Sequence, residues 1–550
     1  MEAASDVNLR GRSLKDLSVI IVSYNAREFL AATLESVFRA GDGLDMEVFV
    51  VDNASSDGAP EMVRERFPQV TLMAQSENLG FAKANNLALA DAQGRYLMIL
   101  NPDCILQEDT LTTLVRFMDE HPESGASGPK LLNRDGSFQV AAKRGLPTPW
   151  VAFCKLSGLS TMFPRSKAFN YYELGHLDPD EVHEVESLTG AAMMVRREAY
   201  EAVGGLDEDY FMFGEDIDWC YSISKAGWKV HYVPTTQIIH YKGESTRRSD
   251  TDRERHFYNA MRIFARKHFA GNPISTAGIE IGIYLSEIAA RLRKRATVWV
   301  PMLIDFIIIL VSFVFGYHIK FGEFVFREMY LVSVLYALIT LGTLSAMGVY
   351  RGRGHRPIPI LLGMFAGFAI VSTSAYFVKS IAFSRLVIVG TAVAVPLLML
   401  GWRGLVRMAV SRPQARRAVV IGLDDTSRSV MEYLQNGRQP GLRAIGWLVY
   451  DPKHIGESPC GLPVLGLAKD FAQIAEEEHI EEAFFSSKSG SYEKIVKLVS
   501  ANPAKGVNVQ VIPEGYDPEG DVPLLELDLG GPLLSRLANP RGPSMRVRKR

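Results

Sequence analysis

The stretch GGLDEDYFMFGEDIDW, residues 204–219, organises this chain of 550 residues. It places Glu215, Asp216 and Asp218 directly after a loop rich in glycine and aromatic residues. A helix-like run, WCYSISKAGW at 219–228, follows. Like charges crowded on a short loop are costly unless a cation or a proton-bearing group uses them. The stretch therefore points to a site of chemistry rather than to a plain surface loop.

Amino-terminal to this stretch, short β-branched runs alternate with segments of helical spacing. The β-branched and apolar runs are typical of buried strands, and the spacing between them is typical of amphipathic helices. The predicted strands are residues 17–23, 47–51, 70–73 and 96–100, and the predicted helices are residues 27–40, 61–67 and 78–90. Such βαβ alternation predicts an α/β domain with a largely parallel sheet.

Acidic residues follow two of these predicted strands. Asp52 ends the run VVD, and Asp103 ends the run ILNPD. One interpretation is turn chemistry, because Asp and Asn commonly cap helices and close turns. The other places Asp52 on the base or ribose of a nucleotide and Asp103 on a divalent cation beside a diphosphate, since open α/β sheets bind ligands at the carboxyl ends of their strands. Two such strand ends, together with the later acidic cluster, favour the second interpretation.

Residues 17–245 resemble the family 2 glycosyltransferases with the GT-A fold, and most closely the bacterial rhamnosyltransferase-type members. The resemblance is carried, in order, by VIIVSYNA (19–26), VVDNASSDG (50–58), NLGFAKANN (78–86), ILNPD (99–103), TGAAMMVRREAYEAVGGLDEDYFMFGEDIDWCYSISKAGW (189–228) and HYKGES (240–245). It implies an enzyme that transfers a sugar from a nucleotide-diphosphate donor.

The resemblance also assigns roles within these motifs. Asp103 corresponds to the second Asp of the D-x-D metal motif, Asn101 replaces the first, and His240 corresponds to a further ligand of a divalent cation, manganese or magnesium. A packed core histidine is the alternative for His240 taken alone. Nucleotide-sugar binding is expected at Ser23, Asn25, Asp52, Asn53, Asn78, Gly80, Lys83 and Asn101.

By the same resemblance, Asp216 is the general base that deprotonates the acceptor hydroxyl, and Glu215 is an orienting catalytic neighbour. An inverting transfer needs one carboxylate on the acceptor side and a cation on the leaving diphosphate. For Glu215 and Asp218 the alternative is a solvated helix N-terminus favoured by the helix dipole. Further candidates for contact with the acceptor or the diphosphate are Arg144, Asp218 and Arg247, for which solvated charges are the alternative.

The composition of the chain argues against nucleic acid as a partner and favours a reducing compartment. Lys and Arg number 60 against 62 Asp and Glu, so no global basic field attracts nucleic acid. The four cysteines are widely spaced, which fits a reducing compartment. The amino terminus is polar and has no apolar core of a signal peptide.

Four apolar runs, at 297–317, 329–349, 358–378 and 383–402, approach the ~20 residues that span a membrane. The distribution of basic residues predicts that both termini are cytoplasmic. Asp305 inside the first run is a functional candidate by default, and the alternative is that, near a helix end, it simply reaches the interface. The basic amphipathic segment 250–269 is expected either to lie at the membrane interface or to fold back onto the transferase domain.

The last part of the chain predicts a second α/β domain, opening with AVVIG at 418–422. Only Gly422 of a G-x-G-x-x-G fingerprint is present, which favours a structural Rossmann-like module. Residues 297–550 resemble the amino-terminal half of polyprenyl-phosphate phosphoglycosyltransferases, through SAMGVYRGR (345–353), AFSRLVIVG (382–390) and RRAVVIG (416–422). In those proteins the catalytic domain follows a basic stretch that resembles 547–550. The sequence as given ends at this stretch, so we do not predict the phosphosugar transferase activity from it.

These inferences predict a polar tail (1–16), a GT-A domain (17–250), basic amphipathic helices (251–296), four transmembrane helices (297–402) and a cytoplasmic Rossmann-like domain (403–550). The expected function is inverting sugar transfer, with dTDP-rhamnose favoured by the resemblance, to a lipid-linked or growing polysaccharide acceptor. The expected location is a bacterial cell membrane that the chain crosses several times. A homo-oligomer is among the expected partners. The alternatives are a regulatory or scaffold membrane module, and a fragment of an initiating phosphosugar transferase.

Overall fold

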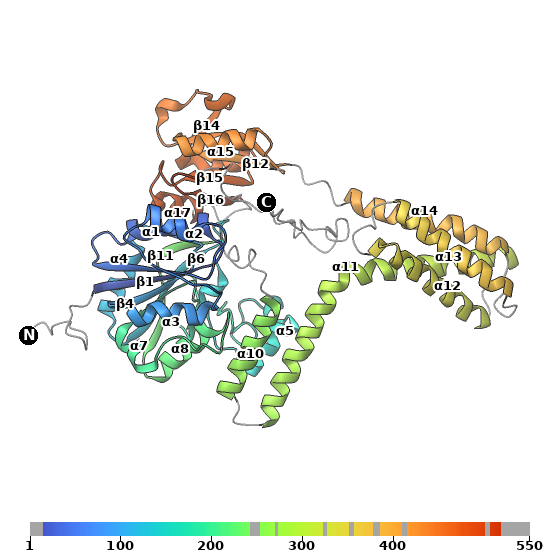
Figure 1. Cartoon of the computed structure of the whole chain (residues 1–550), viewed down its shortest axis with the longest axis horizontal. Coiled ribbons are helices and arrows are strands. Elements are labelled where there is room, and N and C mark those ends of the chain that lie inside the picture. Colours follow the sequence, from blue (N-terminus) through green and yellow to red (C-terminus); the bar gives the residue numbers. More distant parts are fainter. Residues whose placement is uncertain are drawn as a thin grey trace, which may run out of the picture. The chain divides into compact units, whose positions relative to one another are not determined.

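A computed structural model describes residues 15–241, 253–269, 273–322, 327–350, 357–377, 385–409, 415–439, 441–500, 507–516 and 518 (Figure 1). They form two compact units. The described residues up to 285 and from 415 onward make the first unit, and those from 286 to 409 make the second.

The amino-terminal part of the first unit is built on a nine-stranded mixed sheet in the order β3-β2-β1-β4-β10-β6-β11-β5, with β8 paired to β11. Its strands are β1 (Lys15–Ser23), β2 (Met46–Asp52), β3 (Thr71–Ala74), β4 (Gly94–Leu100), β5 (Cys104–Leu106), β6 (Ser124–Leu132), β8 (His183–Glu184), β10 (Ala192–Arg196) and β11 (Lys229–His240). The four strands predicted from the sequence are the parallel half, β3-β2-β1-β4.

The other half of the sheet departs from the prediction of a largely parallel sheet. β10 runs antiparallel to both β4 and β6, and β5 runs antiparallel to β11. This antiparallel pairing brings the end of β11, with His240, beside Cys104 at the start of β5. The reversal therefore joins two motifs that lie far apart in the sequence.

Helices cover both faces of this sheet. In Figure 1 the sheet runs between α1 and α2 on one side and α3, α7 and α8 on the other. α1 occupies the range predicted from helical spacing, and its apolar positions Leu30, Leu34 and Val37 are fully buried. The helices are α1 (Arg27–Ala40), α2 (Ala59–Arg66), α3 (Phe81–Asp91), α4 (Thr110–Glu120), α5 (Pro149–Ser157), α6 (Leu159–Met162), α7 (Arg197–Val203) and α8 (Glu215–Lys225). A small two-stranded sheet pairs β7 (Lys143–Arg144) with β9 (Ser187–Leu188).

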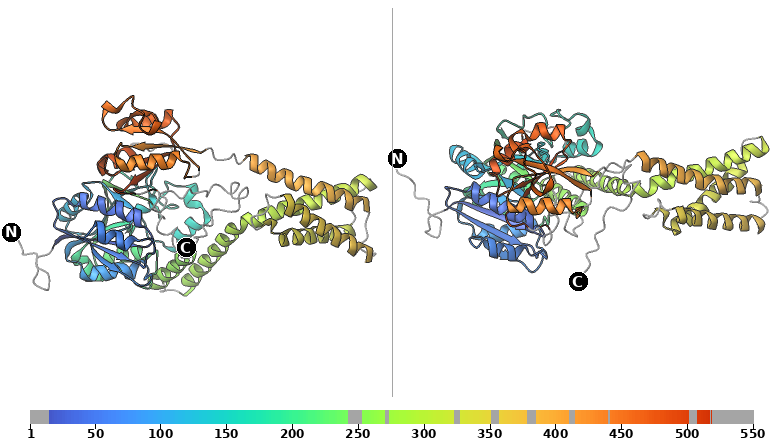
Figure 2. Two further views of the ribbon diagram at one scale, coloured as in Figure 1. Left: turned by 45° about the horizontal axis from the view of Figure 1, so that its top comes forward. Right: turned by 90° about the horizontal axis from the view of Figure 1, so that it is seen from above.

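Two helices follow this sheet in the chain. α10 (Arg253–Phe269) packs its Ala260 and Phe264 against Tyr210 and Ile217, so it folds back onto the domain, the second of the two predicted arrangements. The long helix α11 (Pro273–Phe321) begins beside α10 (Figure 2), and Arg266 of α10 pairs with Glu280 of α11 at 2.9 Å.

The carboxyl-terminal sheet of the first unit has five parallel strands in the order β14-β13-β12-β15-β16. Its strands are β12 (Arg416–Ile421), β13 (Leu442–Val449), β14 (Val464–Leu467), β15 (Glu482–Ser486) and β16 (Asn508–Ile512), and its helices are α15 (Asp425–Gln435), α16 (Phe471–Glu477) and α17 (Tyr492–Ser500). The Asp424 side chain caps α15 by accepting the Ser427 N–H at 2.9 Å. A carboxylate therefore occupies the helix N-terminus that a nucleotide phosphate would otherwise use.

The second unit holds the apolar helices α12 (Arg327–Ala346), α13 (Pro357–Phe377) and α14 (Arg385–Ala409) with the end of α11. Three segments are long and apolar enough to cross a membrane: Val298–Phe321, Pro357–Ser374 and Leu386–Val406. The predicted run 329–349 falls on α12, whose apolar part within the described residues is the shorter Val332–Ala346.

Asp305 lies within this helical unit with its charge paired. Its carboxylate accepts two hydrogen bonds from Arg403, at 2.6 and 2.9 Å, and one each from the Tyr350 hydroxyl and the Trp402 ring N–H. Buried charges are tolerated when they are paired and hydrogen-bonded in this way. Through Arg403 and Trp402 these contacts join α11 to α14, and the functional role suggested by the sequence stays a prediction.

Candidate active site

A cavity of about 860 Å³ opens at the carboxyl ends of β1, β2 and β4. Its walls include Asp103 and His240, and also Glu215 and Asp216 of α8. The lining also includes Phe81 of α3, Val151 and Lys155 of α5, and Phe257, Met261 and Phe264 of α10. The acidic motifs predicted to act together therefore face a single cavity.

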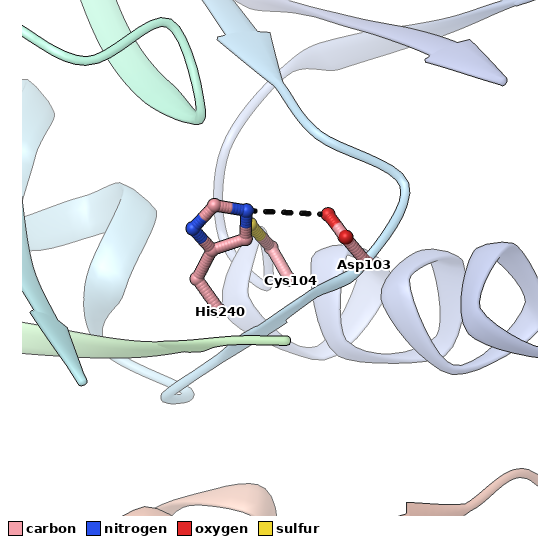
Figure 3. Close-up of side chains that lie close together, drawn as sticks. All are labelled: Asp103, Cys104 and His240. Atoms are coloured by element: carbon pink, nitrogen blue, oxygen red, sulfur yellow. Dashed lines mark ion pairs between the residues drawn. The ribbon is translucent and has the colours of Figure 1, made fainter. Parts of the chain in front are cut away.

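Asp103 and His240 form the centre of a candidate metal site. His240 Nε2 lies 3.4 Å from Asp103 Oδ1 (Figure 3). Asp103 is 1% exposed, and neither of its carboxylate oxygens accepts a hydrogen bond from any residue that the structure describes. A buried carboxylate without donors is costly. A bound cation would remove that cost, so these two residues fit a divalent metal.

Gln139 fixes the orientation of the His240 ring. The Gln139 amide nitrogen donates to Asn133 Oδ1 at 3.0 Å, so its oxygen faces His240 Nδ1 at 2.7 Å. His240 Nδ1 therefore donates to Gln139, and Nε2 faces Asp103 and Asn101. Metal-binding histidines are commonly oriented in this way, by a hydrogen bond from the ring nitrogen that does not face the metal. The sequence analysis missed Gln139, because no motif marks a single glutamine 101 residues away from its partner.

Cys104 lies beside this pair but is a poor ligand for such a cation. Its thiol is fully buried and donates to the Ala191 carbonyl at 3.5 Å. Burial, together with the neighbouring Asp103 charge, raises the pKa of the Cys104 thiol well above its ordinary value. The protonated sulfur suits neither manganese nor magnesium, which prefer oxygen ligands. Asn101, whose amide lies 3.3 Å from His240 Nε2, is the better third candidate.

Asp216 is held in place by three donors. Arg144 of β7 donates to its Oδ2 at 2.6 Å, the Gly190 N–H donates to the same oxygen at 2.9 Å, and the Ile217 N–H donates to Oδ1 at 2.8 Å. Burial would lower the pKa of the Arg144 guanidinium, but the Asp216 charge outweighs burial and holds that pKa above its usual range. Arg144 also lines the cavity, so its predicted contact with the acceptor or the diphosphate stays a prediction beside its contact with Asp216.

Glu215 directly precedes Asp216 and is buried beside it. Burial and the Asp216 charge raise the pKa of Glu215 above its ordinary value. Its Oε2 is buried and has no hydrogen-bond partner among the described residues. Two adjacent carboxyl groups whose environments differ in this way are typical of acid–base sites. The raised pKa of Glu215 suits the predicted role of an orienting neighbour beside the base.

The predicted nucleotide-binding residues fall into two groups. Asn53, Asn78, Gly80 and Asn101 line the cavity. Gly80 has φ +83°, and a Cβ there would lie 2.5 Å from the Phe211 carbonyl oxygen, so this turn requires glycine. Asn53 supports the turn by donating to the Gly80 carbonyl at 3.0 Å.

The remaining predicted nucleotide contacts are not in the lining of the cavity. Asp52 and Ser23 are register partners at the ends of β2 and β1, and Asp52 Oδ1 and the Ser23 hydroxyl are buried without partners among the described residues. Burial raises the pKa of Asp52, and its hydrogen bonds from Ser55 oppose that rise. Asn25 instead accepts the Ser56 N–H at 2.8 Å, and Lys83 is exposed on α3.

Asp218 and Arg247 complete the predicted set. Asp218 Oδ1 lies 2.5 Å from His268 Nε2, and its Oδ2 accepts a hydrogen bond from Lys267 at 2.7 Å. These contacts to α10 give Asp218 a role in fastening that helix, and Asp218 is not among the residues of the cavity wall. Arg247 lies outside the described residues.

Comparison with known proteins identifies three family matches. The model of glycosyl transferase family 2 matches residues 18–204, and the model of glycosyl transferase family group 2 matches residues 169–350. A CoA-binding domain model matches residues 345–513. The first two matches together cover the nine-stranded sheet and its cavity.

Similar proteins include two rhamnosyltransferases. The N-acetylglucosaminyl-diphospho-decaprenol L-rhamnosyltransferase of Mycobacterium tuberculosis is 30% identical over 266 residues, which are 46% of this chain and 85% of that protein. Rhamnosyltransferase WbbL of Escherichia coli strain K12 is 26% identical over 46% of this chain and 94% of that protein. The structure of S. aureus TarS 1–349 in complex with UDP is 16% identical, with a TM-score of 0.32 over 66% of this chain and 91% of that chain.

Proposed function

Because the chain belongs to glycosyl transferase family 2, we propose that it is a membrane-anchored, metal-dependent inverting glycosyltransferase. It takes a sugar from a nucleotide-diphosphate donor and transfers it to a lipid-linked or growing polysaccharide acceptor. The observation that carries this proposal is the shared cavity, in which Asp103 and His240 face the same space as Glu215 and Asp216.

The residues of the cavity divide the chemistry between them. Asp216 accepts the proton of the acceptor hydroxyl, while Arg144 and the Gly190 N–H hold its carboxylate in one orientation. The deprotonated oxygen attacks the anomeric carbon, and the bond from that carbon to the diphosphate breaks with inversion. A divalent cation held by Asp103 and His240, with Asn101 beside them, would neutralise the charge that develops on the leaving diphosphate.

Polar residues of the cavity wall support the position of the donor. Asn53, Asn78 and Gly80 line the cavity at the carboxyl end of β2 and before α3, where a nucleoside would meet polar groups of the chain. Asp52 and Ser23 lie behind this lining at adjacent strand ends. The resemblance to rhamnosyltransferases favours dTDP-rhamnose as the donor. The relative from Mycobacterium tuberculosis is named for a diphospho-decaprenol substrate, which favours a lipid-linked acceptor here.

The helices of the second unit support a membrane location. Three segments could cross a bilayer by length and composition. We place the nine-stranded sheet and the carboxyl-terminal sheet on the cytoplasmic side of a bacterial cell membrane, where nucleotide sugars are available. The strand order β14-β13-β12-β15-β16 favours a doubly wound, Rossmann-like module. Its first turn holds Asp424 in place of a phosphate cradle, which favours a structural role over nucleotide binding.

The test is release of nucleoside diphosphate by the detergent-purified full chain. UDP-, GDP- and dTDP-sugars are supplied in turn with a polyprenyl-diphosphate-linked acceptor, with manganese, with magnesium or with chelator. The expected result is metal-dependent release from one donor that requires the acceptor. Absence of release from every donor in the presence of both metals would contradict the proposal.

A further inference from the structure

We propose that Tyr241 is a positioning residue that couples the metal site to the carboxyl-terminal sheet, so that docking of that sheet sets the affinity of the site for a divalent cation. The inference rests on the metal role proposed above for Asp103 and His240. Tyr241 directly follows His240 and is 6% exposed. Its N–H donates to the Asp103 carbonyl at 2.9 Å, so its backbone is tied to both predicted ligands.

The Tyr241 hydroxyl is tied to the carboxyl-terminal sheet. β16 is an edge strand of that sheet and pairs with β15. N–H groups alternate in direction along a strand, and those of Val509 and Val511 point away from β15. The Val511 N–H donates to the Tyr241 hydroxyl at 3.0 Å, and the Val509 N–H donates to the Arg134 carbonyl at 2.8 Å. An edge strand leaves such donors unpaired unless another element covers it. The nine-stranded sheet supplies that cover.

Apolar packing continues this contact behind the metal site. One buried cluster contains Ile105 of β5, Ile239 of β11 and Tyr241 together with Val509 and Val511 of β16. Ile105 lies two residues after Asp103, and Ile239 directly precedes His240. A displacement of β16 would therefore open a cavity behind the backbone that carries both ligands, and interiors packed at crystal-like density transmit such shifts.

Helix α1 forms a second connection between the carboxyl-terminal sheet and the backbone beside Asp103. Arg39 of α1 donates to the Ser487 carbonyl at 3.2 Å and lies 4.8 Å from the centre of the Tyr492 ring. The same helix carries Thr33, whose hydroxyl donates to the Pro102 carbonyl at 2.8 Å. The backbone carbonyls just before and at the predicted metal ligand are thus both bonded to elements that touch the carboxyl-terminal sheet. This makes the docked sheet part of the support of the metal site.

The experiment compares manganese affinity across matched variants of the full-length protein in detergent. Tyr241→Phe removes the acceptor of the Val511 N–H. Val511→Pro removes the donor, and the β15 ladder is spared because that N–H points away from it. Tyr232→Phe is the control, because Tyr232 is a buried tyrosine of β11 whose hydroxyl donates to the Pro179 carbonyl at 2.7 Å, away from the carboxyl-terminal sheet. Free manganese is followed by electron paramagnetic resonance, and amide exchange of β5 is measured in the metal-free protein.

Removal of an outer partner of a metal ligand typically weakens metal affinity by about 10–100-fold. Tyr241 contacts the backbone of Asp103 and not its carboxylate, so its effect on the metal should be smaller. We expect manganese to bind about 3–10-fold more weakly to Tyr241→Phe and Val511→Pro. The double variant should bind manganese no more weakly than Val511→Pro alone, because that change has already removed the hydrogen bond that Tyr241→Phe removes. β5 amides should exchange faster in both variants, and Tyr232→Phe should match the wild type in both measurements.

Two results would overturn the inference, and they are distinguishable. If the wild type binds manganese and Tyr241→Phe matches Tyr232→Phe in affinity and in β5 exchange, the coupling through Tyr241 is wrong while the metal site stands. If the wild type binds no manganese, or Asp103→Asn binds it equally well, the proposed metal role is wrong and the coupling falls with it.

Discussion

Replacing Asp103 with asparagine should stabilise the metal-free protein and abolish its response to manganese. The carboxylate is 1% exposed and neither oxygen accepts a hydrogen bond from the described residues. A buried group left unsatisfied costs about 1–3 kcal/mol, and more when it is charged. Asparagine has nearly the same shape and no charge, so the variant should recover part of that cost. Each kcal/mol corresponds to about 2–4 °C in melting temperature for a domain of this size.

In the presence of manganese, the wild type should melt at a higher temperature than Asp103→Asn, the reverse of their order in chelator. A ligand at 100 times its dissociation constant stabilises the folded state by about 2.7 kcal/mol, and this gain requires the Asp103 carboxylate. Intrinsic-fluorescence melting of the full chain, with chelator and with manganese, measures both effects.

Asp57→Asn is the control, since Asp57 accepts the N–H groups of Arg27 and Ala59 away from the metal site. It should lower the melting temperature and keep the manganese shift. An Asp103→Asn variant that melts lower than wild type in chelator, or that still responds to manganese, would refute the reasoning.

Three further predictions follow from individual contacts. Glu215→Gln should raise the melting temperature at pH 8 and leave it unchanged near pH 5: because the folded-state pKa of Glu215 is raised above 4.5, the folded protein holds the extra proton and loses stability as pH rises from there. An advantage that grows toward acid pH would contradict this. Gln139→Leu should weaken manganese binding about 10–100-fold by releasing the His240 ring, and calorimetry that finds wild-type affinity would rule the orientation out. Arg403→Met should cost about 3–5 kcal/mol by leaving Asp305 unpaired, and adding Asp305→Asn should recover most of it in thermal melts; a double variant no more stable than the single one would count against the pairing.

Local patterns predicted the parallel half of the large sheet. The runs around β1 and β2 are continuous and rich in β-branched residues, and the run around β4 is continuous and apolar. All three are buried on both faces, so the sequence signal and the structure agree. β6 reads SGASGPKLL, which has no β-branched residue, and β11 contains two register shifts. Strands of this kind form because their neighbours supply the pairing, and that context is absent from a single sequence.

In the candidate site, too, local motifs predicted some residues, while others depend on neighbours that are distant in the sequence. Asp103, Asp216 and His240 were predicted from motifs, and the structure brings them to one cavity. Their supports were not predictable, because Gln139 and Arg144 approach from 101 and 72 residues away in the sequence. The alternatives for α10 could be separated only by its packing against Tyr210 and Ile217, since a basic amphipathic sequence suits a membrane surface and a protein surface equally well.

The decisive measurement is the turnover of Asp216→Asn beside the wild type, with saturating donor, acceptor and manganese. Asn keeps the shape of the side chain and cannot accept the acceptor proton as a carboxylate does. The expected result is a loss of about 100-fold or more in turnover, with manganese affinity and nucleoside-diphosphate affinity both unchanged. A variant that binds both ligands normally and turns over at the wild-type rate would contradict the assignment of the base, and with it the chemistry proposed for the cavity.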